Sequence, residues 1–222
     1  MSKLLLTILT AGSILLATYA PAQTQADFEI VLLGTGTPPP LMNRFGPATL
    51  VHVNGKTFLF DAGRGATQRM WQKRVRFGQG LDYLILTHLH SDHVLGIPDI
   101  FLTGWLGGPF GRRKEPMKLM GPPGTAALAK NLVAAYDWDI QTRIADQKLA
   151  PAGATIAARD IQPGVAYEAG GVKITAFKVD HGGGIIDPVY GYRIDYDGRA
   201  AVISGDRVYN ETLIEQAKAW TC

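Results

Sequence analysis

Three of the chain's five histidines and one aspartate lie within a single hexapeptide. His88, His90, Asp92 and His93 follow the apolar run 81–86, which has the length and composition of a buried strand. Side chains two residues apart on an extended chain point to the same side, so the first two histidines would face one point. Imidazole and carboxylate are ligands that suit zinc and similar divalent metals. We therefore predict a metal site after this strand, and not a polar loop that is rich in histidine by chance.

Three further residues stand at the ends of apolar runs. His181 follows the run 172–179, Asp206 follows the run 200–203, and Asp61 ends another short apolar stretch. Strand ends are where α/β sheets usually place their chemistry. A lone histidine is more often a surface residue, however, and aspartates are common in turns. The residues alone leave a site role open for each of the three, against a surface position for the histidine and a turn role for the two aspartates.

The cluster at positions 88–93 resembles the signature of the metallo-β-lactamase-fold hydrolases. The Gly-Ile-Pro at 96–98 and the Gly-Tyr-Arg at 191–193 are similar to the ribonuclease Z and arylsulfatase-like branch of that family. The resemblance implies an α/β fold, a four-layer αββα sandwich whose cleft lies at one edge of the paired sheets.

The resemblance also implies ligand roles for six residues, which are His88, His90, Asp92, His93, His181 and Asp206. The second metal would take Asp92 and His93, Asp206 would be shared, and the first metal would take the remaining histidines. Asp92 would also hold the attacking hydroxide in line, as a catalytic residue. Asp61 resembles the aspartate of the family's Asp-x-Gly-x-Gly element, which supports the ligands from behind. Zinc is the expected metal, two ions per complete site, with manganese or iron as alternatives.

In such a site a metal-bound hydroxide attacks phosphorus, sulfur or a carbonyl carbon. We expect a small-molecule ester substrate and favour a phosphodiester or a sulfate ester, by analogy with the branch. Thioester or lactone hydrolysis and iron-dependent sulfur oxygenation use similar ligands and stay open. A lactamase with a cysteine ligand is disfavoured, because Asp206 takes that position and the single cysteine is Cys222.

Composition is typical of one globular domain, with 46% hydrophobic and 18% charged residues. The formal charge of +3 is small. The one basic run, Arg112-Arg113-Lys114, is interpreted as a solvated turn, because a nucleic-acid surface needs a broader basic face. A single cysteine excludes an internal disulfide and a multi-cysteine metal site.

The N-terminal residues predict a signal peptide over 1–22. Lys3 precedes the apolar stretch 4–18, which is too short for a comfortable membrane span, and Ala20-Pro21-Ala22 offers small residues for cleavage. We expect a periplasmic or secreted protein whose hydrolase domain, 27–222, has no membrane span.

The patterning predicts strands at 28–33, 49–53, 57–61, 81–86, 117–120, 172–179 and 200–203, and helices at 66–74, 97–106, 124–138 and 211–219. Asn54-Gly55 is a strong two-residue hairpin signal between two of these strands. His52 lies in the first strand of that hairpin and is interpreted as structural.

Two departures from the family pattern stand out. Too few residues separate Arg193 from Ser204 to hold the tRNA-binding arm that ribonuclease Z enzymes usually insert there, which argues against tRNA maturation. The family's last strand and last histidine ligand would come after Cys222. We therefore expect a C-terminally truncated fold, and a fragment without catalysis is the alternative to an enzyme.

Overall fold

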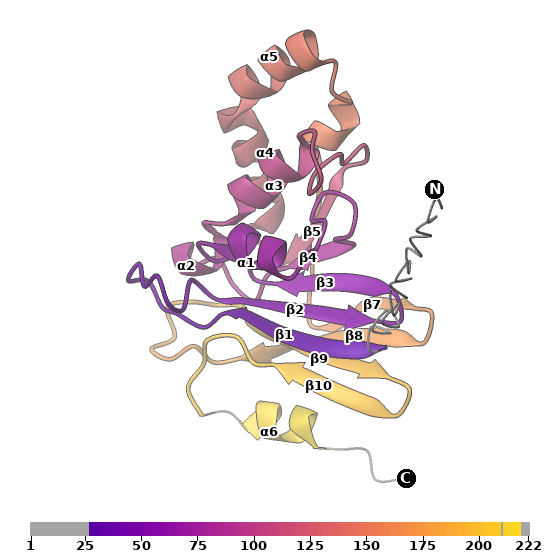
Figure 1. The fold of residues 1–222 in the computed structure, drawn as a ribbon. Coiled ribbons are helices and arrows are strands. Elements are labelled where there is room, and N and C mark those ends of the chain that lie inside the picture. The colour runs from indigo at the N-terminus through magenta and orange to yellow at the C-terminus, as the bar shows by residue number, and fades with distance from the viewer. Residues whose placement is uncertain (1–26, 210, 219–222) are drawn as a thin grey trace, which may run out of the picture.

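The computed structural model describes residues 27–209 and 211–218. Two sheets stack face to face, with helices on their outer sides (Figure 1). The predicted signal peptide and residues 219–222 lie outside the described residues. Within the described ranges, no helix has both the length and the apolar character needed to cross a membrane.

The first sheet has six strands in the order β1-β2-β3-β4-β5-β6. Their bounds are Phe28–Gly34, Ala48–Val53, Lys56–Phe60, Tyr83–Ile85, Met117–Gly121 and Ile156–Asp160. The strands β1, β2 and β3 are antiparallel, whereas β3 to β6 are parallel. Parallel pairing brings the C-terminal ends of β3 and β4 to the same edge, with Phe60 opposite Ile85. The predicted Asn54-Gly55 turn is confirmed, and both of its residues have positive φ.

The second sheet has four antiparallel strands in the order β10-β9-β8-β7. Their bounds are Gly164–Ala169 for β7, Val172–Val179 for β8, Val189–Tyr196 for β9 and Arg199–Ile203 for β10. Only Asp197 and Gly198 connect β9 to β10, and both have positive φ, as a tight hairpin turn requires.

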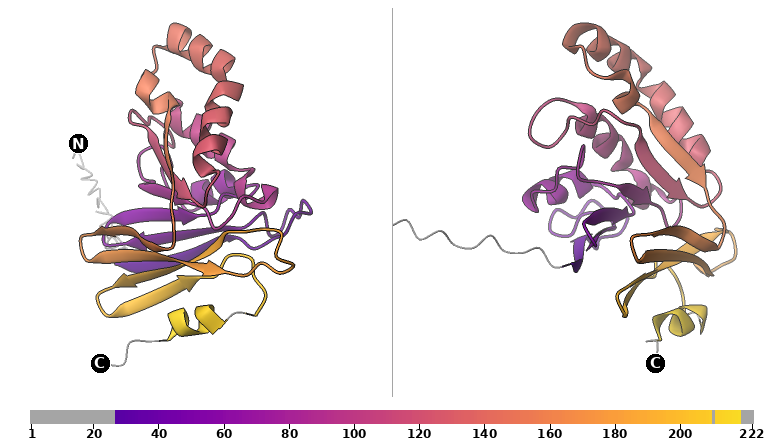
Figure 2. Two further views of the ribbon diagram at one scale, coloured as in Figure 1. Left: turned by 180° about the vertical axis from the view of Figure 1, so that it is seen from behind. Right: turned by 90° about the vertical axis from the view of Figure 1, so that its right-hand side faces the viewer.

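The helices are α1 (Ala66–Gln72), α2 (Ser91–Val94), α3 (Ile97–Trp105), α4 (Thr125–Ala135), α5 (Asp137–Gln147) and α6 (Glu211–Ala217), with a short 3-10 turn at Pro151–Ala154. Figure 2 shows α6 on the outer side of the second sheet and the longer helices on the outer side of the first. The predicted four-layer order is confirmed. The pair α4 and α5 rises beyond the sheets.

Two hydrophobic clusters form the core, one under the helices and one between the sheets. Alternation along β3 divides its side chains between them: Leu59 packs toward the helices, while Phe58 and Phe60 pack toward the second sheet. Tyr192 of β9 meets Phe60 with ring centroids 5.3 Å apart. Its hydroxyl donates to the carbonyl of Leu86 at 2.7 Å. The second sheet therefore holds the end of β4, where the histidine cluster begins.

Several sequence predictions were wrong in detail. The helix expected over 124–138 is two helices that meet at Tyr136, and α5 was not predicted. The strands β6, β7 and β9 were also not predicted. Two of them, β6 and β7, are edge strands that carry mostly exposed or half-exposed residues, so the apolar run that marks a buried strand is absent.

The basic run at 112–114 was interpreted as a solvated turn, and this interpretation is wrong for Arg113. It is 8% exposed, and its guanidinium donates to the carbonyl oxygens of Phe101 and Gly153. Burial lowers its pKa to about 10. The side chain links helix α3 to the turn before β6, so its role is structural. Arg112 and Lys114, by contrast, are exposed as predicted.

Candidate metal centre

The segments that follow β3 and β4 lie at the same edge of the first sheet, and they form the buried side of the site. Asp61 follows β3 with a φ of 59°, in the left-handed region. Its Oδ1 accepts the backbone N–H of Thr87 at 2.8 Å, and its Oδ2 accepts the Thr87 hydroxyl at 2.8 Å and Nδ1 of His93 at 2.8 Å. One buried carboxylate thus fixes both ends of the histidine-bearing loop.

Thr87 sets the orientation of His88 in turn. Its hydroxyl donates to Asp61, so it accepts from Nδ1 of His88, which lies 2.9 Å away. This leaves Nε2 of His88 as the unprotonated ring nitrogen. Sequence reasoning overlooked Thr87, although a hydroxyl residue directly before the first histidine was a visible signal.

Three histidines converge from two sheets. Ligand atoms of His88, His90 and His181 all lie within 4.8 Å of one another. Nε2 of His88 and Nδ1 of His90 are 3.1 Å apart. The ring centroid of His181 is 5.1 Å from that of His88 and 4.8 Å from that of His90. The structure brings together the three residues assigned to the first metal.

A second group shares one of those histidines. Ligand atoms of His88, His93 and Asp206 also lie within 4.8 Å of one another. Nε2 of His93 is 3.4 Å from Oδ1 of Asp206. Gly205, whose φ is 60°, lets the chain turn beside Thr87, so the end of β10 presents Asp206 to the loop.

Asp92 stands at the margin of these groups. It is buried in the first turn of α2, and its Oδ2 is 3.8 Å from Nε2 of His93. It belongs to neither of the two converging groups found among the described residues. Its assigned roles as ligand and as catalytic residue stay predictions. His52 also lies outside both groups, in β2, where Nδ1 contacts the Thr57 hydroxyl at 2.9 Å.

Burial and the neighbouring charges give the two buried histidines opposite protonation states. Burial, with His93 and His90 nearby, lowers the pKa of His88 to about 3, so its ring is neutral. Burial also acts to lower the pKa of His93, but the carboxylates of Asp206 and Asp61 outweigh it and raise that pKa to about 10. Interaction with His93 in turn lowers the pKa of Asp206. Without a metal, the result is one neutral imidazole beside a charged imidazolium–carboxylate pair, and a metal bound at Nε2 of His93 would displace the proton from that nitrogen.

The donor atoms fit a divalent metal. The Nε2 atoms of His93 and His181 are buried and make no hydrogen bond within the described part of the chain. Buried polar atoms are normally satisfied, so two such nitrogens aimed into a cluster of imidazole and carboxylate indicate ligands. Zinc suits this donor set, and its identity stays a prediction.

Close backbone packing explains the glycines around the cluster. A Cβ on Gly63 would meet the carbonyl oxygen of Asp92 at 2.5 Å, and one on Gly96 would meet the carbonyl oxygen of Gly63 at 2.4 Å. The amide of Ala62 donates to the carbonyl of His93 at 2.8 Å. The segment after β3 therefore packs directly against α2.

Comparison with known proteins identifies the family. A family model described as a beta-lactamase superfamily domain matches residues 56–221. The chain belongs to the metallo-β-lactamase superfamily and is ribonuclease Z-like. It is 39% identical over 189 residues to a ribonuclease Z of Mycobacterium marinum, covering 85% of this chain and 66% of that protein. It is 41% identical over 180 residues to a ribonuclease Z of Mycobacterium avium, covering 81% of this chain and 63% of that protein.

Solved structures show the same fold. The metallo-beta-lactamase fold protein YhfI from Bacillus subtilis matches with a TM-score of 0.61 at 22% identity, covering 84% of this chain and 66% of YhfI. The short form of human tRNase Z, ELAC1, matches with a TM-score of 0.60 at 20% identity, covering 84% of this chain and 73% of ELAC1. The predicted fold class and family are confirmed. The chain spans just under two thirds of the length of the two mycobacterial relatives.

Proposed function

We propose that this metallo-β-lactamase domain is a metal-dependent hydrolase of phosphodiesters. The observation that carries the proposal is the convergence of two ligand groups on His88, together with buried ring nitrogens on His93 and His181 that make no hydrogen bond to the described residues. The substrate class rests on the mycobacterial relatives, which are named ribonuclease Z.

The proposal assigns each residue of the cluster a role. His88, His90 and His181 would hold one metal, and His93 and Asp206 would hold a second, with Asp92 beside them. When bound, zinc lowers the pKa of water and stabilises the charge that develops on the attacked group. The residues prepare this chemistry by fixing ring orientation and excluding solvent from the buried face of the cluster.

The substrate can be tested with a panel of chromogenic esters. We expect turnover of a bis-aryl phosphate to exceed turnover of an aryl sulfate, a thioester, a lactone or a cephalosporin. His90→Ala should lose turnover of every ester that the wild type hydrolyses, and His52→Ala should retain it. A preference for aryl sulfate would favour the sulfatase-like branch, and turnover that persists in His90→Ala would refute the assigned site. A well-folded, metal-loaded chain without turnover would favour a non-catalytic fragment.

We also propose that the protein is exported. The support is the pattern of Lys3, the apolar stretch 4–18 and Ala20-Pro21-Ala22. N-terminal sequencing of the mature protein should begin near Gln23. Recovery of the intact N-terminus from the cytoplasm would refute export.

A further inference from the structure

The Gly-Tyr-Arg motif at 191–193 lies in β9, outside the two ligand groups. Alternate side chains of a strand point to opposite faces of its sheet. Tyr192 packs between the two sheets, and its hydroxyl donates to the carbonyl of Leu86 at 2.7 Å, just before the histidine-bearing loop. Gly191 and Arg193 lie on the opposite face, against which α6 rests (Figure 2). The motif therefore serves both faces of the second sheet.

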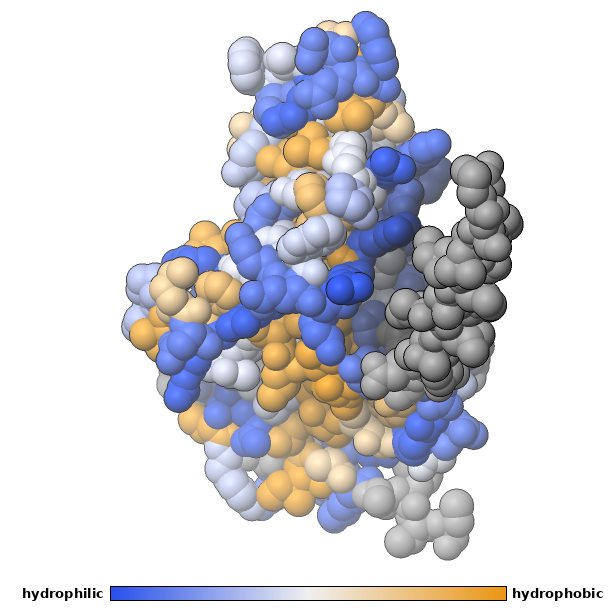
Figure 3. All heavy atoms as spheres, viewed as in Figure 1, coloured by the Kyte–Doolittle hydropathy of each residue, from blue (hydrophilic) through white to orange (hydrophobic). Residues whose placement is uncertain are grey.

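Gly191 makes room for the apolar surface beneath α6. A Cβ at this position would meet ring carbon Cζ of Phe177, its partner in β8, at 2.5 Å. Phe177 belongs to a small apolar cluster, and Leu213 of α6 packs against that cluster. No residue of α6 is itself buried. Figure 3 shows this helix open to solvent, with hydrophobic and hydrophilic side chains on its surface. Apolar packing alone therefore holds α6 weakly.

Arg193 supplies the polar part of the attachment. Its Nη1 donates to the carbonyl oxygens of Gln216 and Lys218, the latter at 3.1 Å, at the carboxyl end of α6. Its Nε and Nη2 both lie 2.8 Å from Oδ1 of Asp195 on the same strand. The last carbonyls of a helix have no partner within the helix and favour a cation, so a guanidinium group at this end stabilises α6. Because Arg193 is only 6% exposed, its charge depends on these partners.

The other end of α6 leads back to the metal centre. Asp206 lies in the segment 204–209, between β10 and α6. Its side chain is 50% exposed, so little packing fixes it. The neighbouring backbone is restrained by the amide of Val208, which donates to the carbonyl of Asp180 at 3.0 Å. The segment is also held through the elements that it joins, β10 before it and α6 after it (Figure 1). A shift of α6 would therefore move the segment that presents Asp206.

We propose that Arg193 is a positioning residue for Asp206. By holding the carboxyl end of α6 on the second sheet, it keeps the segment 204–209 on the course that brings Asp206 within 3.4 Å of His93. Strand β9 thus places ligands from both of its faces: Tyr192 holds the start of the histidine-bearing loop, and Arg193 holds the aspartate. The inference rests on the proposed second metal, which Asp206 would bind together with His93.

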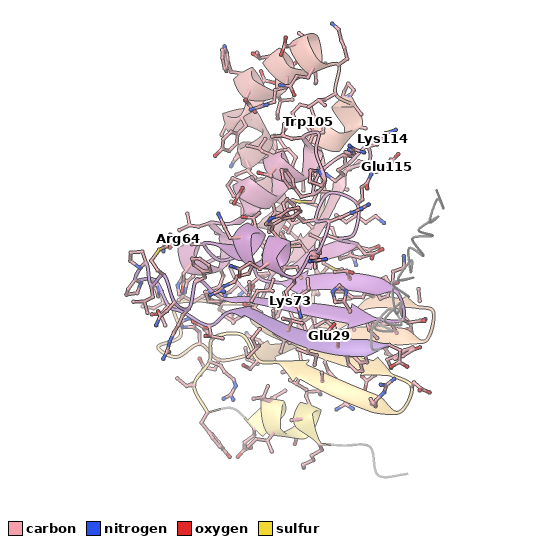
Figure 4. The ribbon with its side chains drawn as sticks, in the orientation of Figure 1. Glu29, Arg64, Lys73, Trp105, Lys114 and Glu115 are labelled. Atoms are coloured by element: carbon pink, nitrogen blue, oxygen red, sulfur yellow. The ribbon has the colours of Figure 1, made fainter. Side chains whose placement is uncertain are left out.

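The test compares Arg193 with two other cations of the full chain. Arg193→Gln removes the charge and most of the donors, and Arg193→Lys keeps the charge with a single donor group. Arg199→Gln is the matched control in the same sheet, because Arg199 lies in β10 and pairs with Asp27 instead of α6. Lys114→Gln removes an equal charge at a site far from α6 (Figure 4).

A separate variant breaks α6 and leaves Arg193 in place. Glu215→Pro puts proline in the interior of the helix, where it removes a backbone donor and clashes with the preceding turn. Because Glu215 is exposed, this change removes no core side chain. If Arg193 acts through α6, both variants should have the same effect on the segment 204–209, and Glu215→Pro decides the proposal if Arg193→Gln does not fold.

Hydrogen exchange of the metal-free chain, followed by mass spectrometry, measures the positioning. In Arg193→Gln and in Glu215→Pro we expect the amides of 204–209 to exchange about tenfold faster than in the wild type, while the amides of β8 keep their protection. Arg193→Lys should lie between the wild type and Arg193→Gln. Arg199→Gln and Lys114→Gln should match the wild type.

Zinc titration against a chromogenic chelator then separates the two metals. In Arg193→Gln we expect the second equivalent of zinc to bind about tenfold more weakly and the first to bind as in the wild type. An arginine that only stabilised the fold would weaken both equivalents together. If the wild type takes up a single equivalent, the proposed second metal is wrong, whereas the exchange comparison still decides the role of Arg193.

Three results would overturn the proposal. The first is unchanged exchange over 204–209 in Arg193→Gln or in Glu215→Pro. The second is equally fast exchange of this segment in Arg199→Gln, which would mean that loss of a charge on the second sheet is sufficient. The third is faster exchange throughout the second sheet of Arg193→Gln with equal loss of both metals, because Arg193 would then serve only the stability of the fold.

Discussion

Oδ2 of Asp61 lies 2.8 Å from Nδ1 of His93, and both side chains are almost fully buried. A carboxylate accepts only, so Nδ1 carries the proton and Nε2 faces the ligand cluster. The same carboxylate holds the amide and the hydroxyl of Thr87. Asp61 therefore orients the ligands although it belongs to neither converging group.

The first prediction follows from this arrangement. Asp61→Ala should weaken metal binding by about 10- to 100-fold, because the ring of His93 loses its orienting partner. Competition with a chromogenic chelator measures the affinity. Asp82→Ala is a control, since Asp82 pairs with Lys56 on the surface. Equal metal affinity in Asp61→Ala and the wild type would show that Asp61 does not support the ligands and serves only in the turn.

A second prediction concerns the three-histidine group. His90→Ala should remove the tightly bound metal, because two of the three ligands cannot hold zinc as well. Metal analysis after dialysis should show lower stoichiometry for His90→Ala and unchanged stoichiometry for His52→Ala. An unchanged metal content in the first variant would show that His90 is not a ligand.

The sequence predicts the parts of the site that are local, and it misses those that depend on distant packing. The spacing of His88 and His90 after an apolar run places them together with no knowledge of the fold. Asp206 and His181 were assigned from the family resemblance, and only the stacking of the second sheet on β4 brings them near. Arg113 was misinterpreted because its acceptors, the carbonyls of Phe101 and Gly153, are set by tertiary structure. Arg74 and Lys56 line the same groove beside α1, but the search for runs of consecutive basic residues did not find this grouping, because the two residues are far apart in the sequence.

A third prediction tests the close packing beneath the metal loop. Gly63→Ala should destabilise the fold by about 1–3 kcal/mol, because the added methyl would meet the carbonyl of Asp92 and the backbone of Gly46. Gly107→Ala is a matched control, since a Cβ there meets nothing within 4 Å. Denaturant unfolding of the two variants gives the comparison. If both unfold at the same denaturant concentration, the segment after β3 can move away from α2 at no cost.

The last prediction separates two neighbouring arginines of one basic run. Arg113→Ala should lower the free energy of unfolding by about 2–4 kcal/mol, because buried carbonyls lose their donor and a cavity remains under α3. Arg112→Ala should change it by less than about 0.5 kcal/mol, since that side chain is exposed. Both variants lose one positive charge, so a difference between them reports burial and hydrogen bonding. Chemical denaturation followed by circular dichroism measures both values. Equal, small losses would mean that Arg113 is solvated after all and that the sequence-based interpretation was right.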